Sequence, residues 1–162
     1  MGRNNYPIQG TFPKVIYGEF YDTTDQTPAV DTVTQITINT QEESQGITLS
    51  SNALTVSDAG TYAFNWRMQI EKSSGSVARD IHFWMRKNGS DVAYSAFEVN
   101  IKNNSENSPF GLNEIIALEA GDVITFYMHV PVSDGEGLGI YAHTHVGHPS
   151  IPSIHISVFR IN

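Results

Sequence analysis

The sequence predicts an all-β protein whose strands form antiparallel sheets, as in a sandwich or a barrel. Three observations support this fold class. Residues 61–70 place a large apolar side chain at every second position, other stretches repeat this period of two, and no stretch has the period of an amphipathic helix. Polar turn sequences separate the apolar stretches at the spacing typical of sandwiches and barrels.

The strongest of these stretches is residues 61–70. Five large side chains alternate there with smaller or polar ones: Tyr62, Phe64, Trp66, Met68 and Ile70. In a strand these side chains share one face, whereas a helix would scatter them around its axis. The segment is therefore predicted to be an antiparallel strand with one buried face and one wetter face.

Shorter strands and turns account for the rest of the chain. The pattern predicts about ten strands, over residues 17–22, 33–38, 47–49, 53–56, 61–70, 81–87, 92–99, 112–118, 123–130, 138–145 and 153–161. The Asn88-Gly89 pair predicts a hairpin turn, and residues 119–122 predict a second turn. Residues 103–109 and 134–137 are predicted to be polar loops.

Size and composition predict a single packed domain. The chain has 162 residues, of which 40% are hydrophobic, with 8 Phe, 7 Tyr and 2 Trp to fill a core. It has no cysteine, which excludes disulfide bonds and thiol chemistry. Residues 1–14 have no clear period and are predicted to form an N-terminal arm, and residues 15–162 the sandwich domain.

Charge and hydropathy disfavour two classes of partner. The formal charge of −8 argues against binding the phosphate backbone of nucleic acid. No apolar run approaches the roughly 20 residues of a membrane-spanning helix. The polar start MGRNNYPIQG lacks the apolar core of a signal peptide. We therefore expect synthesis in the cytoplasm of a host cell, and release by lysis or assembly if the protein works outside one.

Some strands carry apolar side chains on both faces. Residues 154, 156 and 158 share one face, whereas Phe159 and Ile161 point to the other, and residues 123–128 show the same doubling. A sandwich needs only one apolar face per strand. Copies of the same chain are predicted to cover the second face, with ordinary exposed hydrophobic residues as the alternative. The candidate interface residues are Tyr17, Tyr127, Phe159 and Ile161.

Five short segments carry a resemblance to a known family. They are YGEFYD (17–22), VSDAGTY (56–62), WMRKNG (84–89), LEAGDV (118–123) and IPSI (151–154). In this order and spacing they resemble the jelly-roll superfamily of the complement component one q globular head and tumour necrosis factor, and are most similar to its bacteriophage members. The resemblance implies a jelly-roll sandwich of about ten strands that assembles as a trimer around a three-fold axis.

The same resemblance implies a role in a phage particle. Phage relatives of this kind are virion components, namely capsid decoration proteins, head fibres or tail-fibre knobs. The expected function is a homotrimeric capsid decoration or cement protein that binds the major capsid protein on the capsid surface. The alternative is a receptor- or glycan-binding knob, in which the loops at Asn103 and Asp134 contact a host surface with help from Phe110 and Tyr141.

The N-terminal arm combines basic and apolar side chains. This composition suits a segment that docks onto a partner surface, because the three arms of a trimer would bind that surface together. An ordinary disordered terminus is the alternative. The candidate capsid-docking residues are Arg3, Tyr6, Pro7, Ile8, Phe12 and Lys14.

One histidine cluster has a spacing that suits a metal. His143 and His145 share one side of a predicted strand, and His148 follows a glycine. Three neutral imidazoles hold Zn²⁺ or Ni²⁺, especially if a three-fold axis joins three copies; a polar strand end is the alternative. Two groups of loop acids are expected to be solvated rather than to bind Ca²⁺, namely Asp22, Asp25 and Asp31, and Asp134 and Glu136.

No catalytic motif is present in the sequence. It has no nucleophile elbow, no phosphate-binding loop and no dinucleotide-binding fingerprint. We therefore expect neither an enzyme nor a bound cofactor.

Overall fold

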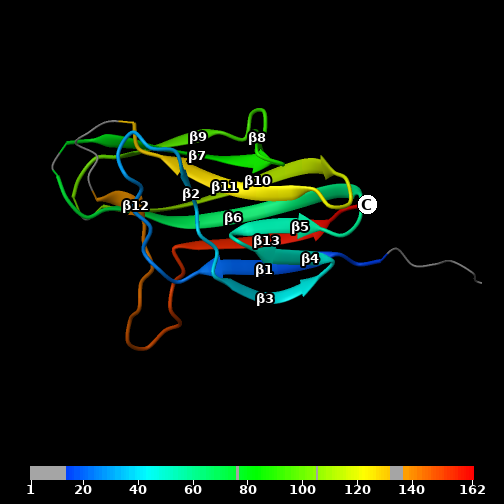
Figure 1. Cartoon of the computed structure of the whole chain (residues 1–162). Helices are drawn as coiled ribbons and strands as arrows, with labels where there is room; N and C mark the ends of the chain where they lie inside the picture. Colours follow the sequence, from blue (N-terminus) through cyan, green and yellow to red (C-terminus); the bar gives the residue numbers. More distant parts are fainter. Residues whose placement is uncertain (1–13, 76, 105, 132–136) are drawn as a thin grey trace, which may run out of the picture.

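The computed structural model describes residues 14–75, 77–104, 106–131 and 137–162, which form thirteen strands and no helix (Figure 1). The six-stranded sheet contains β3 (Thr40–Gln45), β1 (Tyr17–Asp22), β13 (Ile154–Arg160), β6 (Gly60–Lys72) and β10 (Asn107–Leu118) in that order, with β12 (Leu138–Ile140) also paired to β6. The described part of the chain thus contains no helix long and apolar enough to cross a membrane.

The second layer is a seven-stranded sheet. It contains β4 (Ile47–Ser50), β5 (Ala53–Val56), β11 (Val123–His129), β7 (Arg79–Lys87) and β8 (Ser90–Asp91) in that order. Two further strands join it, since β2 (Thr34–Gln35) pairs with β11 and β9 (Phe97–Ile101) pairs with β7. All strand pairs of both sheets are antiparallel. The predicted all-β antiparallel sandwich is confirmed.

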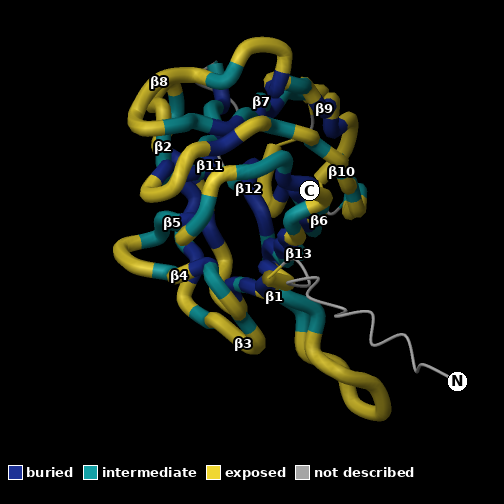
Figure 2. Tube along the Cα trace, turned by 90° about the vertical axis from the view of Figure 1, so that its right-hand side faces the viewer, coloured by how far each residue is buried: buried dark blue, intermediate teal, exposed yellow. Residues whose placement is uncertain are grey.

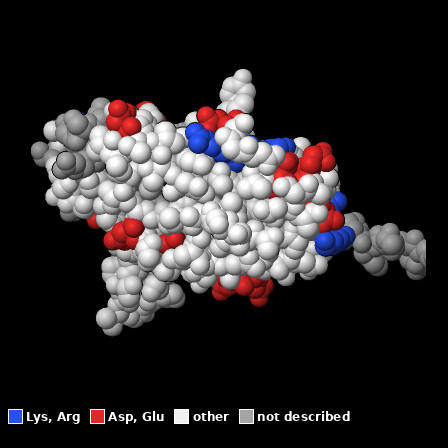
Figure 3. Space-filling view, viewed as in Figure 1, with Lys and Arg blue, Asp and Glu red and all other residues white. Residues whose placement is uncertain are grey.

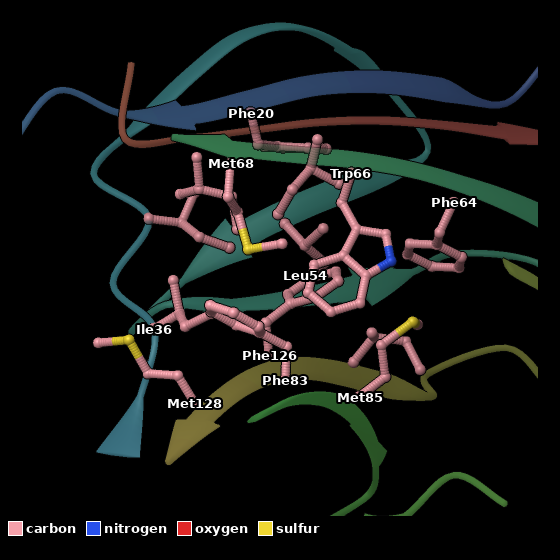
Figure 4. Packing of buried hydrophobic residues seen from close by; sticks show 14 of the residues in the cluster. Phe20, Ile36, Leu54, Phe64, Trp66, Met68, Phe83, Met85, Phe126 and Met128 are labelled. Carbon is pink, nitrogen blue, oxygen red and sulfur yellow. The ribbon is translucent and has the colours of Figure 1, made fainter. Parts of the chain in front are cut away.

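The core lies between the two sheets and follows from the period of two. Tyr62, Phe64, Trp66, Met68 and Ile70 of β6 are each at most 1% exposed. They face side chains of the other sheet, including Phe126, whose ring centroid lies 5.0 Å from that of Trp66 (Figure 4). Figure 2 shows the same division, with buried strand interiors and exposed turns. The prediction of one buried face on this strand is confirmed.

Two strand predictions near the N-terminus differ from the structure. Of the predicted strand 33–38 only β2 is formed, because side chains satisfy the next backbone groups: the Thr37 N–H donates to Gln26 Oε1 and the Ile38 N–H to Asn52 Oδ1. Strand β3 was not predicted, since its sequence TQEESQ has no apolar alternation. It pairs with β1 at the edge of its sheet, where a strand needs no apolar face.

Three later boundaries also differ. Of the predicted strand 92–99 only the part from Phe97 is formed, as the start of β9, because the chain turns before it at Tyr94, which has a φ of 64°. The predicted loop 103–109 is partly strand, because β6 extends to Lys72 and offers β10 a partner from Asn107 onward. The predicted strand 138–145 ends at Ile140, and the chain then projects from the sandwich as a loop held by a bridge between His143 and Ile151 (Figure 1).

Asp122 joins two of the predicted turns. Its carboxylate accepts hydrogen bonds from the Glu119 N–H at 2.8 Å and from Asn88 Nδ2 at 2.7 Å, and it pairs with Lys87 Nζ at 2.8 Å. The Lys87 contact, then the bonds from Glu119 and Asn88, lower the pKa of Asp122 from 3.8 to about 2. The 119–122 turn is thereby tied to the Asn88-Gly89 hairpin.

Replacing Asp122 with Asn is expected to lower the free energy of unfolding by about 1–2 kcal/mol at pH 7, because a charged hydrogen-bond acceptor is lost. A depressed pKa stabilises the fold above the unfolded value of 3.8, and this contribution is lost as the pH falls through about 2. Urea unfolding of both proteins between pH 7 and pH 2 measures this. A difference that persists unchanged at pH 2 would contradict the assignment.

Candidate functional site

A row of apolar side chains crosses the outer face of the six-stranded sheet. Ile115 of β10 lies opposite Ala63 of β6, Ala63 lies opposite Phe159 of β13, and Phe159 lies opposite Tyr17 of β1. Cross-strand partners point to the same face of a sheet. Since the neighbouring residues 16, 62, 116 and 158 fill the core, this row faces outward. Ile115 is 68% exposed and Phe159 45% exposed.

Two more side chains extend the row into a patch. Val15 and Ile161 each lie two residues from a member of the row and are exposed. The apolar patch is defined here as Val15, Tyr17, Ala63, Ile115, Phe159 and Ile161. Of the nine large hydrophobic side chains exposed in the described residues, five belong to this patch, so they are gathered rather than scattered. A gathered, exposed apolar surface is typical of an interaction site.

Polar rows limit the patch to one end of the sheet. The next row along the strands contains Asn113, Asn65, Ser157 and Glu19. The first three of these residues border a small groove of about 190 Å³, which is also lined by Arg67 and His155. Burial lowers the pKa of His155, with a smaller contribution from nearby Arg67, so its imidazole is neutral at pH 7. An apolar centre beside polar hydrogen-bonding groups is the usual composition of a protein interface.

The patch lies at the end of the sandwich where the described chain begins and ends (Figure 1). Asn162 Oδ1 accepts a hydrogen bond from the Thr61 N–H at 2.9 Å. Lys14 Nζ lies 2.7 Å from Asp58 Oδ2 and also donates to Ser57 Oγ. The hydrogen bond from Lys14, followed by that from Ser57, lowers the pKa of Asp58.

The predicted sites fall in different places. Tyr17, Phe159 and Ile161 lie together in the apolar patch, whereas Tyr127 lies on the outer face of the seven-stranded sheet, stacked against Trp84. Sequence reasoning missed Ile115, although the adjacent pair Ile115-Ile116 places apolar groups on both faces of its strand. Of the predicted arm, Lys14 contacts the domain, while Arg3, Tyr6, Pro7, Ile8 and Phe12 lie outside the described residues.

The three histidines of the predicted metal site lie near one another on the projecting loop. The ring centroids of His143 and His145 are 6.0 Å apart, and those of His145 and His148 are 4.9 Å apart. His143 Nε2 is also 3.3 Å from Glu71 Oε2. Within the described residues of one chain, no group of three His, Cys, Asp or Glu side chains is arranged to hold a metal ion. A site shared between chains stays a prediction.

The expectation of solvated loop acids is wrong for Asp22, which ends strand β1 and is 1% exposed. Every one of these acids that is described has a protein partner. Asp22 accepts hydrogen bonds from Thr24 and Thr37, and Asp25 accepts one from the Ala142 N–H. Asp31 lies 3.4 Å from His129 Nε2. Asp134 and Glu136 lie outside the described residues.

No protein-family model matches the chain, and no curated protein matches it. Its function is therefore inferred from the residues and their geometry.

The aromatic side chains assigned to a glycan-binding knob are engaged in other contacts. The Phe110 ring stacks on Phe97 with centroids 4.8 Å apart, at the edge of the core. The Tyr141 hydroxyl donates to the Gly137 carbonyl at 2.7 Å. Figure 3 shows that the charged side chains on one face of the molecule form small separate groups, with wide areas that carry neither sign. The apolar patch, which contains five of the nine exposed large hydrophobic side chains of the described residues, is therefore the candidate site.

Proposed function

We propose that this protein is a virion structural protein, a homotrimeric jelly roll that decorates and cements a phage capsid. The apolar patch carries the proposal, because an acidic protein with its exposed hydrophobic groups gathered on one face gains stability by covering that face with another copy. The number of copies, and the phage capsid as partner, come from the resemblance to the jelly-roll superfamily.

The strand order supports the jelly-roll topology. The first and last strands, β1 and β13, lie side by side inside one sheet. The chain crosses repeatedly between the two layers, for example from β5 in the seven-stranded sheet to β6 in the other and back to β7. The same crossing takes the chain from β10 to β11. Such repeated crossing between two antiparallel sheets is the pattern of a jelly roll.

The location of the patch supports attachment by the arm. The patch surrounds the point where the chain enters the domain, next to Lys14, so assembly through the patch would bring three entry points to one end of the trimer. Three weakly binding arms on one rigid body act together through their effective concentration. A trimer that bridges neighbouring capsid subunits raises the free energy needed to separate them.

Removing residues 1–12 is expected to abolish attachment to capsids while the oligomer stays intact, because the arm and the patch have separate roles. Co-sedimentation with undecorated capsids measures attachment, and sedimentation velocity measures the oligomer. A protein with the same twelve residues in scrambled order is the matched control for length and composition. Unchanged attachment of the truncated protein would refute the role of the arm.

Electron microscopy of the intact particle distinguishes decoration from the alternative of a receptor-binding knob. Copies spread over the whole capsid surface are expected, since a cement protein must reach most capsid subunits. A few copies at one vertex, or binding of the purified protein to host cells without capsid binding, would favour the knob.

A further inference from the structure

A pocket on the outer face of the seven-stranded sheet has no part in the proposed assembly. It has a volume of about 420 Å³ and is lined by His82, Trp84, Ala96, Phe97, Glu98 and His129. These residues come from β7, β11, β9 and the residue before β9. The apolar patch lies on the other sheet, so assembly through that patch leaves the pocket accessible to a ligand.

The indole ring of Trp84 is held rigidly at one side of the pocket. Its Nε1–H donates to Asp91 Oδ1 at 2.8 Å, and Arg86 Nε donates to the same oxygen at 2.6 Å. These two bonds lower the pKa of Asp91, with Arg86 the larger cause, so Asp91 is a carboxylate at neutral pH. An aromatic side chain fixed before binding loses little conformational entropy when a ligand stacks on it.

Neighbouring strands give the two sides of Trp84 different surroundings. Tyr127 of β11 pairs with Trp84 in the sheet, and the two rings stack with centroids 5.8 Å apart. The Arg86 guanidinium lies 4.1 Å from the centroid of Tyr127 and covers that side. On the side of β9, Ala96 leaves room next to the indole. The pocket therefore offers one face of Trp84 to a ligand.

Hydrogen-bonding groups lie beside this aromatic surface. His82 Nε2 lies 2.8 Å from Glu98 Oε2, within hydrogen-bonding distance, and the other ring nitrogen, Nδ1, is a second polar group of this side chain. In the described part of the chain no hydrogen bond to Glu98 Oε1 is formed, and the Glu98 side chain is 60% exposed. The ring of His129 lies 6.0 Å from that of His82, centroid to centroid.

We propose that this pocket binds an uncharged pyranose sugar, with the apolar C–H face of the ring stacked on Trp84 and its hydroxyl groups hydrogen-bonded to Glu98 and His82. The pocket combines a large apolar surface with a few convergent polar groups, as small-ligand sites do. A neutral sugar is favoured because no Lys or Arg of the described residues lines the pocket and Glu98 repels an anion. The proposal does not depend on the trimer, and it gives a decorated particle a means of holding glycans.

The two tryptophans make the proposal testable by NMR, because Trp66 is buried and Trp84 lines the pocket. The protein is titrated with lactose, maltotriose, cellotriose and chitotriose. With at least one of them the Trp84 indole signal is expected to shift saturably, with a dissociation constant on the order of 1 mM, while the Trp66 signal stays in place. Trp84→Ala lacks the pocket indole, so its binding is followed through the backbone amide signals of the pocket residues; it is expected to weaken binding about tenfold or more, which corresponds to about 1.4 kcal/mol.

Two further variants keep the test independent of folding. Glu98→Gln keeps the shape of an exposed side chain and is expected to weaken binding several-fold. Tyr21→Ala removes an aromatic ring from the outer face of the other sheet, where it stacks on His155, and is expected to leave binding unchanged. The proposal is overturned if none of the four saccharides shifts the Trp84 signal, if both pocket variants bind like the unmodified protein, or if 3′-sialyllactose binds more tightly than lactose.

Discussion

Replacing Phe159 with Asp is expected to convert the proposed trimer into a folded monomer. Phe159 lies in the middle of the apolar patch, between Ala63 and Tyr17 on the neighbouring strands. In the monomer its side chain is 45% exposed, so a carboxylate there stays hydrated and the sandwich still folds. In the trimer the same carboxylate would be buried without a partner, at a cost of several kcal/mol for each copy.

Sedimentation velocity at micromolar concentration measures the change, and unfolding by urea checks that the monomer is folded. Val33→Asp is the matched control, because Val33 is 47% exposed but lies outside the patch, next to β2. The control is expected to remain a trimer. A monomeric unmodified protein, or a trimeric Phe159→Asp variant, would refute self-association through this patch.

Replacing Trp66 with Ala is expected to lower the free energy of unfolding by about 3–5 kcal/mol, because it opens a large cavity in the centre of the core. The Trp66 ring packs edge-on against Phe97, with centroids 5.3 Å apart, and against Phe126. This loss is a large fraction of the stability of an ordinary domain. Urea unfolding followed by circular dichroism measures it.

Trp66→Phe is the informative companion variant. The described residues offer no hydrogen-bond partner to the buried Trp66 Nε1–H, so removing this group relieves a desolvation cost while the aromatic packing is largely kept. The expected loss is about 1–2 kcal/mol, much smaller than that of Trp66→Ala. Equal losses in the two variants would mean that the indole N–H contributes favourably to the fold.

Local patterns explain why much of the sandwich could be predicted. The alternation from Tyr62 to Ile70 indicates which side chains are buried, because successive side chains of a strand point to opposite faces. The predicted bounds of two other strands, 17–22 and 53–56, agree with β1 and β5. The prediction was wrong where side chains rather than a neighbouring strand accept the backbone hydrogen bonds, as at Thr37. It was also wrong where a polar edge strand has no apolar alternation, as in β3.

The apolar patch depended on both sources of information. Phe159 and Ile161 were identified from the two-faced pattern of the last strand, and Tyr17 was named as a further candidate interface residue. The structure also places Ile115 beside these residues and Tyr127 on the other sheet. Both facts follow only from the order in which the strands β10, β6, β13 and β1 pair. Alternation assigns a side chain to a face of its own strand, but it carries no information about which distant strand lies beside it.

The sequence by itself determined the class of fold and the side chains that fill the core, because burial on a strand is a local, periodic property. Only the tertiary structure decided which outward-facing side chains are neighbours, both in the patch around Phe159 and in the pocket beside Trp84. Those neighbours come from segments far apart in the chain, and their proximity is set by strand order and register across whole sheets.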